Sequence, residues 1–333
     1  MIERVACLIS REEDLHRNQA AEAQLMETLP AATALLVMYT APKAVSLGLL
    51  EDTAEAVRAE TLRADGGQLS RRLSGGGCRY LDGGTLCYSL LLPREDFRVE
   101  LGQAAAAEAV RRLGVSAAAG PRGSLLAFGR VVGEASFLKR GNAGAQQGVI
   151  YADTDPGQAA LYLTAGVPVA PLSAFRPGIT AEDAMGAFSS VLAEGFRAEP
   201  VWLDECLLDG RSLKDSADRF RAEKWVCRSA PENCYRVEER FPWGKAAICL
   251  ETQNSVISRA QIFTDALETA LIDVLARSLW GCPFLIGAIE KRFSQVVAGT
   301  RDPRLLQVTG DLFTFLRGAL RQSHREGGEN LPR

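Results

Sequence analysis

The spacing of hydrophobic and polar residues at the start of the chain predicts one helix followed by two strands. Residues 12–29 carry apolar side chains at three- and four-residue intervals, which is typical of a helix, and Pro30 ends this pattern. Residues 34–39 form an apolar run, as in a buried strand, and residues 44–48 alternate in the manner of a second strand.

The pattern predicts further elements along the rest of the chain. Alanine-rich and amphipathic stretches indicate helices, and alternating stretches with glycine or asparagine between them indicate hairpins. We expect helices at residues 98–113, 156–163, 180–194, 266–280, 284–298 and 303–321, a hairpin formed by residues 124–128 and 131–135, and a hairpin turning at residues 253–254.

A glycine-rich segment stands out between residues 71 and 89. Two arginines and a serine precede three consecutive glycines, whose backbone N–H groups can approach a ligand without steric obstruction. The arginines supply fixed donors that suit a phosphate or a carboxylate. Residues 79–89 are expected to form a strand, a turn at residues 82–84 and a second strand. The segment indicates a phosphate or nucleotide site, and a glycine-rich connection with solvated arginines is the alternative.

Composition limits the classes of protein to be considered. The 333 residues, 47% of them hydrophobic, are enough for two domains, and a net charge of −3 provides no general attraction to nucleic acid or to an anionic membrane. No apolar run is long enough to cross a bilayer, and the N-terminus does not resemble a signal peptide. We therefore expect neither a nucleic-acid partner nor a membrane.

Eight cysteines are scattered through the chain without a Cys-x-x-Cys pair, and only two histidines are present. Scattered cysteines in a large chain are typical of reduced thiols, so a cytoplasmic location is expected and a protein-bound metal is not. With so few histidines, the chain is poorly supplied with histidine bases.

The order Arg-Arg-x-Ser-Gly-Gly-Gly-x-x-Tyr-x-Asp, followed by Gly-Thr-Leu-x-Tyr-Ser, resembles the lipoate–protein ligase A family. The resemblance implies an enzyme that activates lipoate with ATP and Mg²⁺ to lipoyl-adenylate. The acyl group then passes to a lysine on the lipoyl carrier domain of a 2-oxoacid dehydrogenase or of the glycine-cleavage H protein. By this resemblance Arg72, Ser74, Gly75, Gly76 and Gly77 line the lipoyl-adenylate pocket.

The hairpin at residues 124–135 resembles the family segment that carries its catalytic lysine. Gly133 and Ala135 match the glycine and alanine of that segment, which implies that they border the bound adenylate. This register places Arg130 at the lysine, and a gap of one residue places Val131 there. The lysine stabilises charge between the lipoate carboxylate and the α-phosphate, and arginine cannot reproduce a compact ammonium group.

Other stretches keep the pattern of the family and change its polar residues. Gly148 matches a glycine of the family and is expected in the pocket, but the two histidines before it are Gln146 and Gln147 here. After the strand at residues 44–48, Leu49 replaces an arginine, and an amide pair has become Glu51 and Asp52. Because carboxylates repel an anionic ligand, Glu51 and Asp52 would weaken the binding of a carboxylate or phosphate at this position.

The C-terminal part resembles the accessory domain of full-length lipoate–protein ligases. The resemblance runs from about residue 224 to residue 300 and includes Arg-Phe-Pro-Trp-Gly at residues 240–244. The expected fold is α/β: a biotin/lipoate-ligase-type catalytic domain with a mixed sheet (residues 1–195), a connector (196–222) and a small α/β C-terminal domain (223–333).

Three classes of function follow. The first is an ATP-dependent ligase for lipoate or a related short acid, supported by the glycine motif and the C-terminal domain. The second is a non-catalytic relative that binds a lipoyl domain or an acyl ligand, supported by the missing lysine. The third is an octanoyltransferase that uses a cysteine thioester, for which Cys78 and Cys87 are the nearest thiols although no base neighbours them in the sequence.

Overall fold

The computed structural model of the chain describes residues 2–164, 168–204, 210–227, 235–264 and 270–325. These residues form two compact units, one ending at Arg228 and one beginning at Ser229. Each unit is α/β, as the sequence predicted. Within the described residues, no helix is both long enough and apolar enough to cross a membrane.

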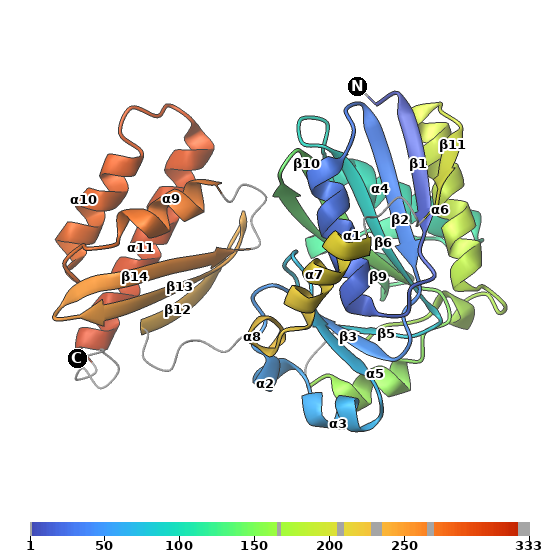
Figure 1. Cartoon of the computed structure of the whole chain (residues 1–333), viewed down its shortest axis with the longest axis horizontal. Coiled ribbons are helices and arrows are strands. Elements are labelled where there is room, and N and C mark those ends of the chain that lie inside the picture. The colour runs from blue at the N-terminus through green and yellow to red at the C-terminus, as the bar shows by residue number, and fades with distance from the viewer. Residues whose placement is uncertain (1, 165–167, 205–209, 228–234, 265–269, 326–333) are drawn as a thin grey trace. The chain divides into compact units, whose positions relative to one another are not determined.

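An eight-stranded mixed sheet forms the centre of the first unit (Figure 1). The first three strands of the order are parallel, and the remaining neighbours are antiparallel. In spatial order the strands are β11 (Pro200–Leu203), β1 (Arg4–Ile9), β2 (Thr33–Tyr39), β6 (Thr85–Pro93), β10 (Ala143–Tyr151), β9 (Arg130–Arg140), β8 (Ser124–Ala127) and β7 (Ala118–Ala119).

Helices cover both faces of this sheet, which is why β2, β6 and β10 are buried along their whole length. On one face, α1 (Leu15–Thr28) packs Met26 against Leu35 and Leu91 of the sheet. On the other face, Phe188 of α6 (Ala181–Phe196) packs edge-on against Tyr88, with 4.8 Å between ring centroids. The helix α4 (Val99–Arg112) lies beside α6.

A second, three-stranded sheet in the first unit holds the glycine-rich segment. Its order is β4 (Gln68–Arg71), β3 (Ala44–Leu47) and β5 (Arg79–Leu81), and the glycines connect its two outer strands. Short helices surround it: α2 (Thr53–Ala56), α3 (Ala59–Ala64), α5 (Pro156–Tyr162) and α8 (Glu223–Val226). Two 3₁₀ turns, at Pro121–Gly123 and Leu172–Ala174, complete the unit apart from α7.

The strands on either side of residues 82–84 do not form the expected hairpin. β5 pairs with β3 in the small sheet, whereas β6 pairs with β2 and β10 in the large sheet. Where the turn crosses between the sheets, the carbonyl of Gly84 accepts from the backbone N–H groups of residues 152 and 153, and a Cβ on Gly84 would come within 2.3 Å of the Asp153 carbonyl oxygen. The prediction of two strands was correct, and the prediction of their pairing was wrong.

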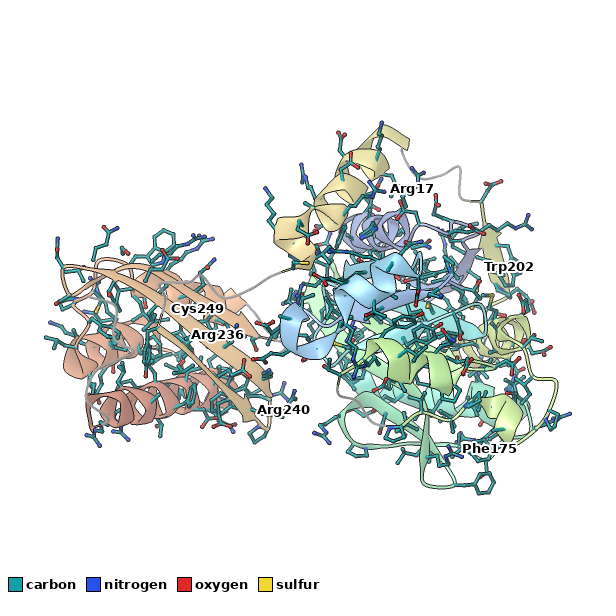
Figure 2. The ribbon with its side chains drawn as sticks, turned by 90° about the horizontal axis from the view of Figure 1, so that it is seen from below. Arg17, Phe175, Trp202, Arg236, Arg240 and Cys249 are labelled. Carbon is teal, nitrogen blue, oxygen red and sulfur yellow. The ribbon has the colours of Figure 1, made fainter. Side chains whose placement is uncertain are left out.

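The segment expected as a connector contributes structure to the first unit. Residues 200–203 form β11 at the edge of the large sheet, where Trp202 (Figure 2) is 53% exposed. The helix α7 (Gly210–Arg221) packs on α1 through Leu213, Ala217 and Phe220. The apolar residues of α7 therefore belong to a hydrophobic cluster of the first unit. The first unit ends only after α8.

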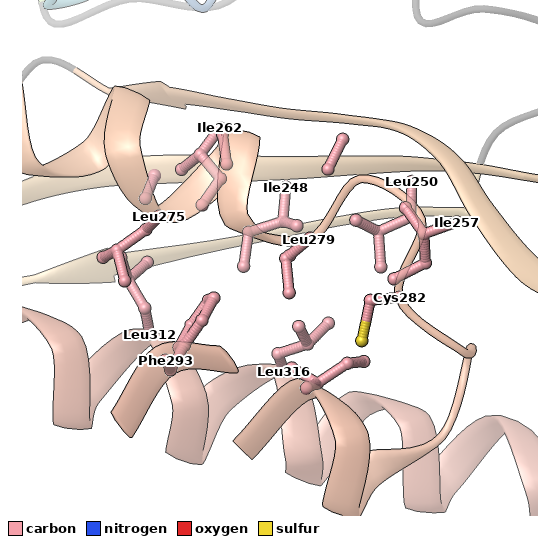
Figure 3. Close-up of a cluster of buried hydrophobic side chains, with 14 of the residues drawn as sticks. Ile248, Leu250, Ile257, Ile262, Leu275, Leu279, Cys282, Phe293, Leu312 and Leu316 are labelled. Carbon is pink, nitrogen blue, oxygen red and sulfur yellow. The ribbon is translucent and has the colours of Figure 1, made fainter. Parts of the chain in front are cut away.

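The second unit is a three-stranded antiparallel sheet covered by helices. Its strands are β12 (Tyr235–Phe241), β13 (Gly244–Gln253) and β14 (Val256–Thr264), and its helices are α9 (Ala270–Ser278), α10 (Ile286–Val296) and α11 (Pro303–Arg325). Strand residues such as Ile248 and Ile262 meet Leu275, Phe293 and Leu316 of the helices in one core (Figure 3). The predicted hairpin and helices are confirmed, except that residues 266–269 lie outside the described residues.

Candidate functional site

The candidate site lies where the small sheet meets β9 and β10 of the large sheet. Residues directly opposite each other on paired strands share a face, so Ser136, Gln147 and Ser89 form one row across the large sheet. This row faces α1, because Gln147 contacts Glu22 of that helix. The glycine-rich loop and its arginines approach the sheet from the same side.

The glycine-rich loop is pressed against the residue that follows β3. The backbone N–H of Leu49 donates to the carbonyl of Ser74 over 2.9 Å. A Cβ on Gly48 would lie 1.8 Å from the carbonyl oxygen of Gly76, and Gly76 itself has a φ of +80°. Both positions therefore require glycine. In contrast, a Cβ on Gly77 would meet nothing within 4 Å.

Arg72 fixes the conformation of this loop by hydrogen bonds to its carbonyl groups. Its Nη2 donates to the carbonyl oxygens of Gly75 (2.6 Å) and Gly77 (2.8 Å), and its Nη1 donates to the carbonyl of Ser46 (2.8 Å). Its Nε donates to Ser136 Oγ over 3.3 Å. The side chain is buried, and burial together with a neighbouring arginine lowers the pKa of Arg72 to about 9, so it stays protonated at neutral pH.

That neighbouring arginine is Arg79 of β5. It is 5% exposed, donates from Nη2 to Ser136 Oγ (3.0 Å) and donates from Nη1 to the carbonyl of Gln147 (3.1 Å). Sequence reasoning did not identify Arg79, Ser136 or Glu22 as site residues. The available signal for Arg79 was a charged residue at the start of a short stretch that was itself predicted to be a strand.

Arg71 points away from the site and serves the fold. Its guanidinium donates to the carbonyl oxygens of Gly48 (2.8 Å), Glu51 (2.7 Å) and Val226 (2.9 Å) and to Thr53 Oγ1 (3.0 Å). It therefore fastens α8 to the segment that follows β3. The two adjacent arginines of the motif have different surroundings because successive residues of a strand point to opposite faces.

A buried carboxyl group extends the site towards α1. Gln147 Nε2 donates to Glu22 Oε2 over 2.5 Å, and Gln147 Oε1 accepts from the backbone N–H of Ser74 over 3.2 Å. Ser74 Oγ lies 2.8 Å from Ser136 Oγ. Burial raises the pKa of Glu22, and the hydrogen bond from Gln147 acts in the opposite direction. This chain of contacts fixes the start of the glycine-rich loop relative to the sheet.

The remaining residues expected in the pocket lie on the other face of the sheet. Ala135 is opposite Gly148, and Gly148 is opposite Tyr88, which packs on α6. A Cβ on Gly148 would lie 2.3 Å from the Tyr88 ring, and one on Gly133 would lie 2.6 Å from the Val149 carbonyl oxygen. At Gly133 and Gly148 the close packing of strands and rings explains why the residue is glycine.

Arg130 does not reach this group of residues. It is the exposed first residue of β9, directly after the turn formed by Phe128 and Gly129, and Phe128 stacks on Phe175 (labelled in Figure 2) with 5.4 Å between centroids. Ser136 lies six residue steps beyond Arg130 along β9, or about 20 Å at roughly 3.3 Å per residue. Val131, the alternative, is buried in an apolar cluster.

The residues that depart from the family pattern have local roles. Asp52 caps α2 by accepting from the backbone N–H of Ala54 over 2.9 Å, and Glu51 contributes its carbonyl to Arg71. Glu134, on the site face of β9, accepts from Tyr151 Oη over 2.6 Å. Gln146 donates to Tyr88 Oη on the opposite face (2.8 Å).

The two cysteines nearest the glycine-rich loop lack the surroundings of a nucleophile. Burial, with a smaller contribution from Glu51, raises the pKa of Cys78 to about 12. Burial also raises the pKa of Cys87, which is part of an apolar cluster. A thiol with a raised pKa carries little thiolate, which is the reactive form.

Comparison with known proteins shows the family. The chain belongs to the family of the lipoyl protein ligase A/B catalytic domain, whose model matches residues 14–193. Residues 230–301 match the bacterial lipoate protein ligase C-terminus. The resemblance found in the sequence is thereby confirmed, as is the lipoate-ligase type of the fold.

Solved structures agree with this fold. P. falciparum LipL1 in complex with lipoate is similar with a TM-score of 0.77 and 16% identity, over 93% of this chain and 99% of that chain. A lipoate-protein ligase A bound with ATP is similar with a TM-score of 0.57 and 19% identity, over 68% and 99%. A bi-partite lipoate protein ligase from Thermoplasma acidophilum, described with its E2 lipoyl domain, gives a TM-score of 0.58 and 17% identity, over 68% and 96%.

Proposed function

We propose that the chain is an ATP-dependent ligase that attaches lipoate, or a similar short acid, to a lysine of a lipoyl carrier domain. One observation carries this proposal: two buried guanidinium groups, Arg72 and Arg79, lie beneath the glycine-rich loop. In the described part of the chain, neither has a carboxylate within 4 Å. A buried, unpaired positive charge is costly, and an anionic ligand would offset that cost.

The reaction has two steps. A carboxylate oxygen of the acid attacks the α-phosphorus of ATP, a new P–O bond forms, and the bond to the β-phosphate breaks to release pyrophosphate. The amine of the carrier lysine, having lost a proton to solvent, then attacks the acyl carbon of the adenylate. An amide bond forms, the acyl–phosphate bond breaks, AMP leaves, and the second amine proton is released.

The residues of the site can bind and orient the adenylate. Arg72 binds the carbonyl groups of Gly75 and Gly77, and Gln147 and Glu22 fix the position of Ser74. Oriented backbone N–H groups and guanidinium donors suit a phosphate group. No group of three metal-ligating side chains occurs among the described residues, so Mg²⁺ would be bound largely through the nucleotide phosphates.

The proposed protein partner is the lipoyl domain of a 2-oxoacid dehydrogenase or the glycine-cleavage H protein. Its support is the similarity to the T. acidophilum ligase that is described together with an E2 lipoyl domain. A cytoplasmic location forms part of the same proposal. The free thiols of the described cysteines, among them Cys78 and Cys227, support it, because disulfides are rare in that compartment.

A second candidate is a non-catalytic protein that binds the acid or its carrier domain. The exposure of Arg130 and the apolar surroundings of Val131 favour it, because neither supplies a cation where the family has its lysine. The raised pKa of Cys78 and Cys87 speaks against a cysteine-dependent octanoyltransferase.

Mass spectrometry of a lipoyl carrier domain tests the proposal. The carrier is incubated with the full chain, Mg²⁺ and lipoate or octanoate, with and without ATP, and a carrier whose acceptor lysine is arginine serves as the control. An ATP-dependent mass increase on the lysine carrier alone supports a ligase. No increase, combined with calorimetric binding of lipoate, supports the non-catalytic candidate. Transfer from octanoyl-carrier thioester without ATP would establish the transferase.

A further inference from the structure

Arg79 is held against the strands that form the floor of the site. Its two hydrogen bonds reach Ser136 Oγ on β9 and the carbonyl of Gln147 on β10, at 3.0 and 3.1 Å. These contacts fix the guanidinium under the glycine-rich loop. A Cβ built on Gly76 would lie 3.1 Å from Nη2 of Arg72 and 3.8 Å from Nη2 of Arg79, so both cations lie beneath the same glycine.

The two arginines differ in how many donors they have in use. Arg72 donates to Ser136 Oγ, to the carbonyl and Oγ of Ser46, and to the carbonyls of Gly75 and Gly77, so all three guanidinium nitrogens are in use. Within the described residues, Arg79 donates two hydrogen bonds out of the five that a guanidinium offers. Arg72 is therefore committed to the loop, and Arg79 retains donors for a ligand.

The placement of the two charges beside each other is electrostatically unfavourable, although both side chains are hydrogen-bonded to the fold. The buried Arg72 and Arg79 repel each other. Glu134 and Glu51 attract Arg72 from a distance, and in the described part of the chain neither arginine has a carboxylate within 4 Å. Unfavourable arrangements of this kind are concentrated at binding and catalytic sites. A planar fork with free N–H groups is suited to the paired oxygens of a carboxylate or a phosphate.

We propose that Arg79 contacts the oxyanion of the activation step and supplies the positive charge that the family obtains from its lysine. Identifying that oxyanion as the acid carboxylate and the α-phosphate of ATP rests on the proposed ligase function. As the carboxylate oxygen bonds to the α-phosphorus, Arg79 stabilises the negative charge on the phosphoryl oxygens, and pyrophosphate departs. The cation thus comes from β5, next to the glycine-rich loop, instead of from the β8–β9 hairpin.

Binding of lipoyl-AMP to the full chain tests this assignment, with thermal unfolding as a second measurement. Arg79→Gln keeps a polar side chain with N–H donors and removes the charge, and Arg79→Met removes both. We expect each variant to bind lipoyl-AMP at least tenfold more weakly than the wild type. Unliganded Arg79→Gln is expected to unfold at the wild-type temperature or above, because an unpaired buried charge has been removed. Arg4→Met, on the exposed start of β1, is the control.

A purely structural role for Arg79 gives the opposite result: the unliganded Arg79→Gln variant unfolds at a lower temperature, and its affinity for lipoyl-AMP is unchanged. That result overturns the assignment. If Arg79→Met fails to fold, the Arg79→Gln measurements decide alone.

Turnover distinguishes this assignment from the ligase proposal. In a wild type that transfers lipoate, Arg79→Gln should lower kcat by about 10²–10³, the usual effect of losing one preorganised electrostatic group. Loss of transfer in Arg130→Met with full activity in Arg79→Gln overturns the assignment and leaves the ligase function intact. A wild type that transfers nothing, but binds lipoyl-AMP through Arg79, overturns the ligase function and leaves the anion site intact.

Discussion

At the scale of single residues, Gly48 has the least space for a side chain among the described glycines. Gly48→Ala places a methyl group 1.8 Å from the carbonyl oxygen of Gly76, so the glycine-rich loop must move. Forcing an extra carbon into a well-packed position typically costs about 1–3 kcal/mol. We expect urea denaturation to show a loss of this size in the free energy of unfolding, together with weaker binding of lipoyl-AMP.

Gly77→Ala is the matched control for this prediction. Gly77 lies in the same loop, and a Cβ there meets no atom within 4 Å. Its substitution should change the free energy of unfolding by about 0.5 kcal/mol or less. Equal losses in the two variants would show that any side chain added to this region, and not the contact between Gly48 and Gly76, accounts for the effect.

Glu22 gives the first unit a defined dependence on pH. Burial raises the pKa of its carboxyl group above the ordinary value of about 4.3. Below pH 4.3 the group is protonated in both the folded and the unfolded chain. Between that pH and the raised pKa, the unfolded chain loses the proton and the folded chain keeps it, so rising pH favours unfolding. Each unit by which the pKa is raised costs about 1.4 kcal/mol.

Urea denaturation of the wild type and Glu22→Gln between pH 4 and pH 8 checks this sign. The free energy of unfolding of the wild type, relative to that of the variant, should fall as the pH rises through this window. Glu194→Gln is the control with the opposite sign and a lower window, because a hydrogen bond from Arg112 lowers the pKa of Glu194. The wild type therefore loses stability relative to this variant only as the pH falls below about 4.3, and it shows no trend above about pH 5. A wild type that gains stability relative to Glu22→Gln at higher pH would contradict the assignment of a raised pKa.

At the scale of helices and strands, local signals were sufficient for most of the fold. The helix α6 begins where Thr180 and Asp183 form a reciprocal cap, which is visible in the sequence as a threonine followed three residues later by an acid. The β8–β9 hairpin turns at Phe128 and Gly129, both with positive φ. Such elements are determined by residues close together in the chain, so spacing alone locates them.

Pairing between distant segments could not be predicted in the same way. β5 resembles the first half of a hairpin, yet it joins β3, more than thirty residues earlier, while Gly84 of the turn lies against Asp153. The site has the same character. Arg79 and Ser136 meet across 57 residues of chain, and Glu22 and Gln147 across 125. The motif indicated the glycine-rich loop and Arg72, while the partners of that loop became evident only in the structure.

At the scale of the whole molecule, the chain contains two separate cores. Leu316 of α11 is fully buried among residues of the second unit, including Ile248 and Phe293 (Figure 3). Leu316→Ala should therefore destabilise residues 235–325 by about 2–5 kcal/mol, through lost burial and the cavity left behind. We expect the first unit, with its core around β2 and β6, to keep its stability, because its buried residues belong to other clusters.

Hydrogen exchange followed by mass spectrometry distinguishes the two units in the full chain. In Leu316→Ala, peptides from β13, β14 and α11 should exchange faster, and peptides from β2, β6 and β10 should exchange at the wild-type rate. Leu36→Ala, a fully buried change in β2, is the reciprocal variant. Faster exchange in both units from either substitution would mean that they unfold as one cooperative structure. Confinement to one unit would let the binding of lipoyl-AMP near Arg79 be measured while the second unit is weakened.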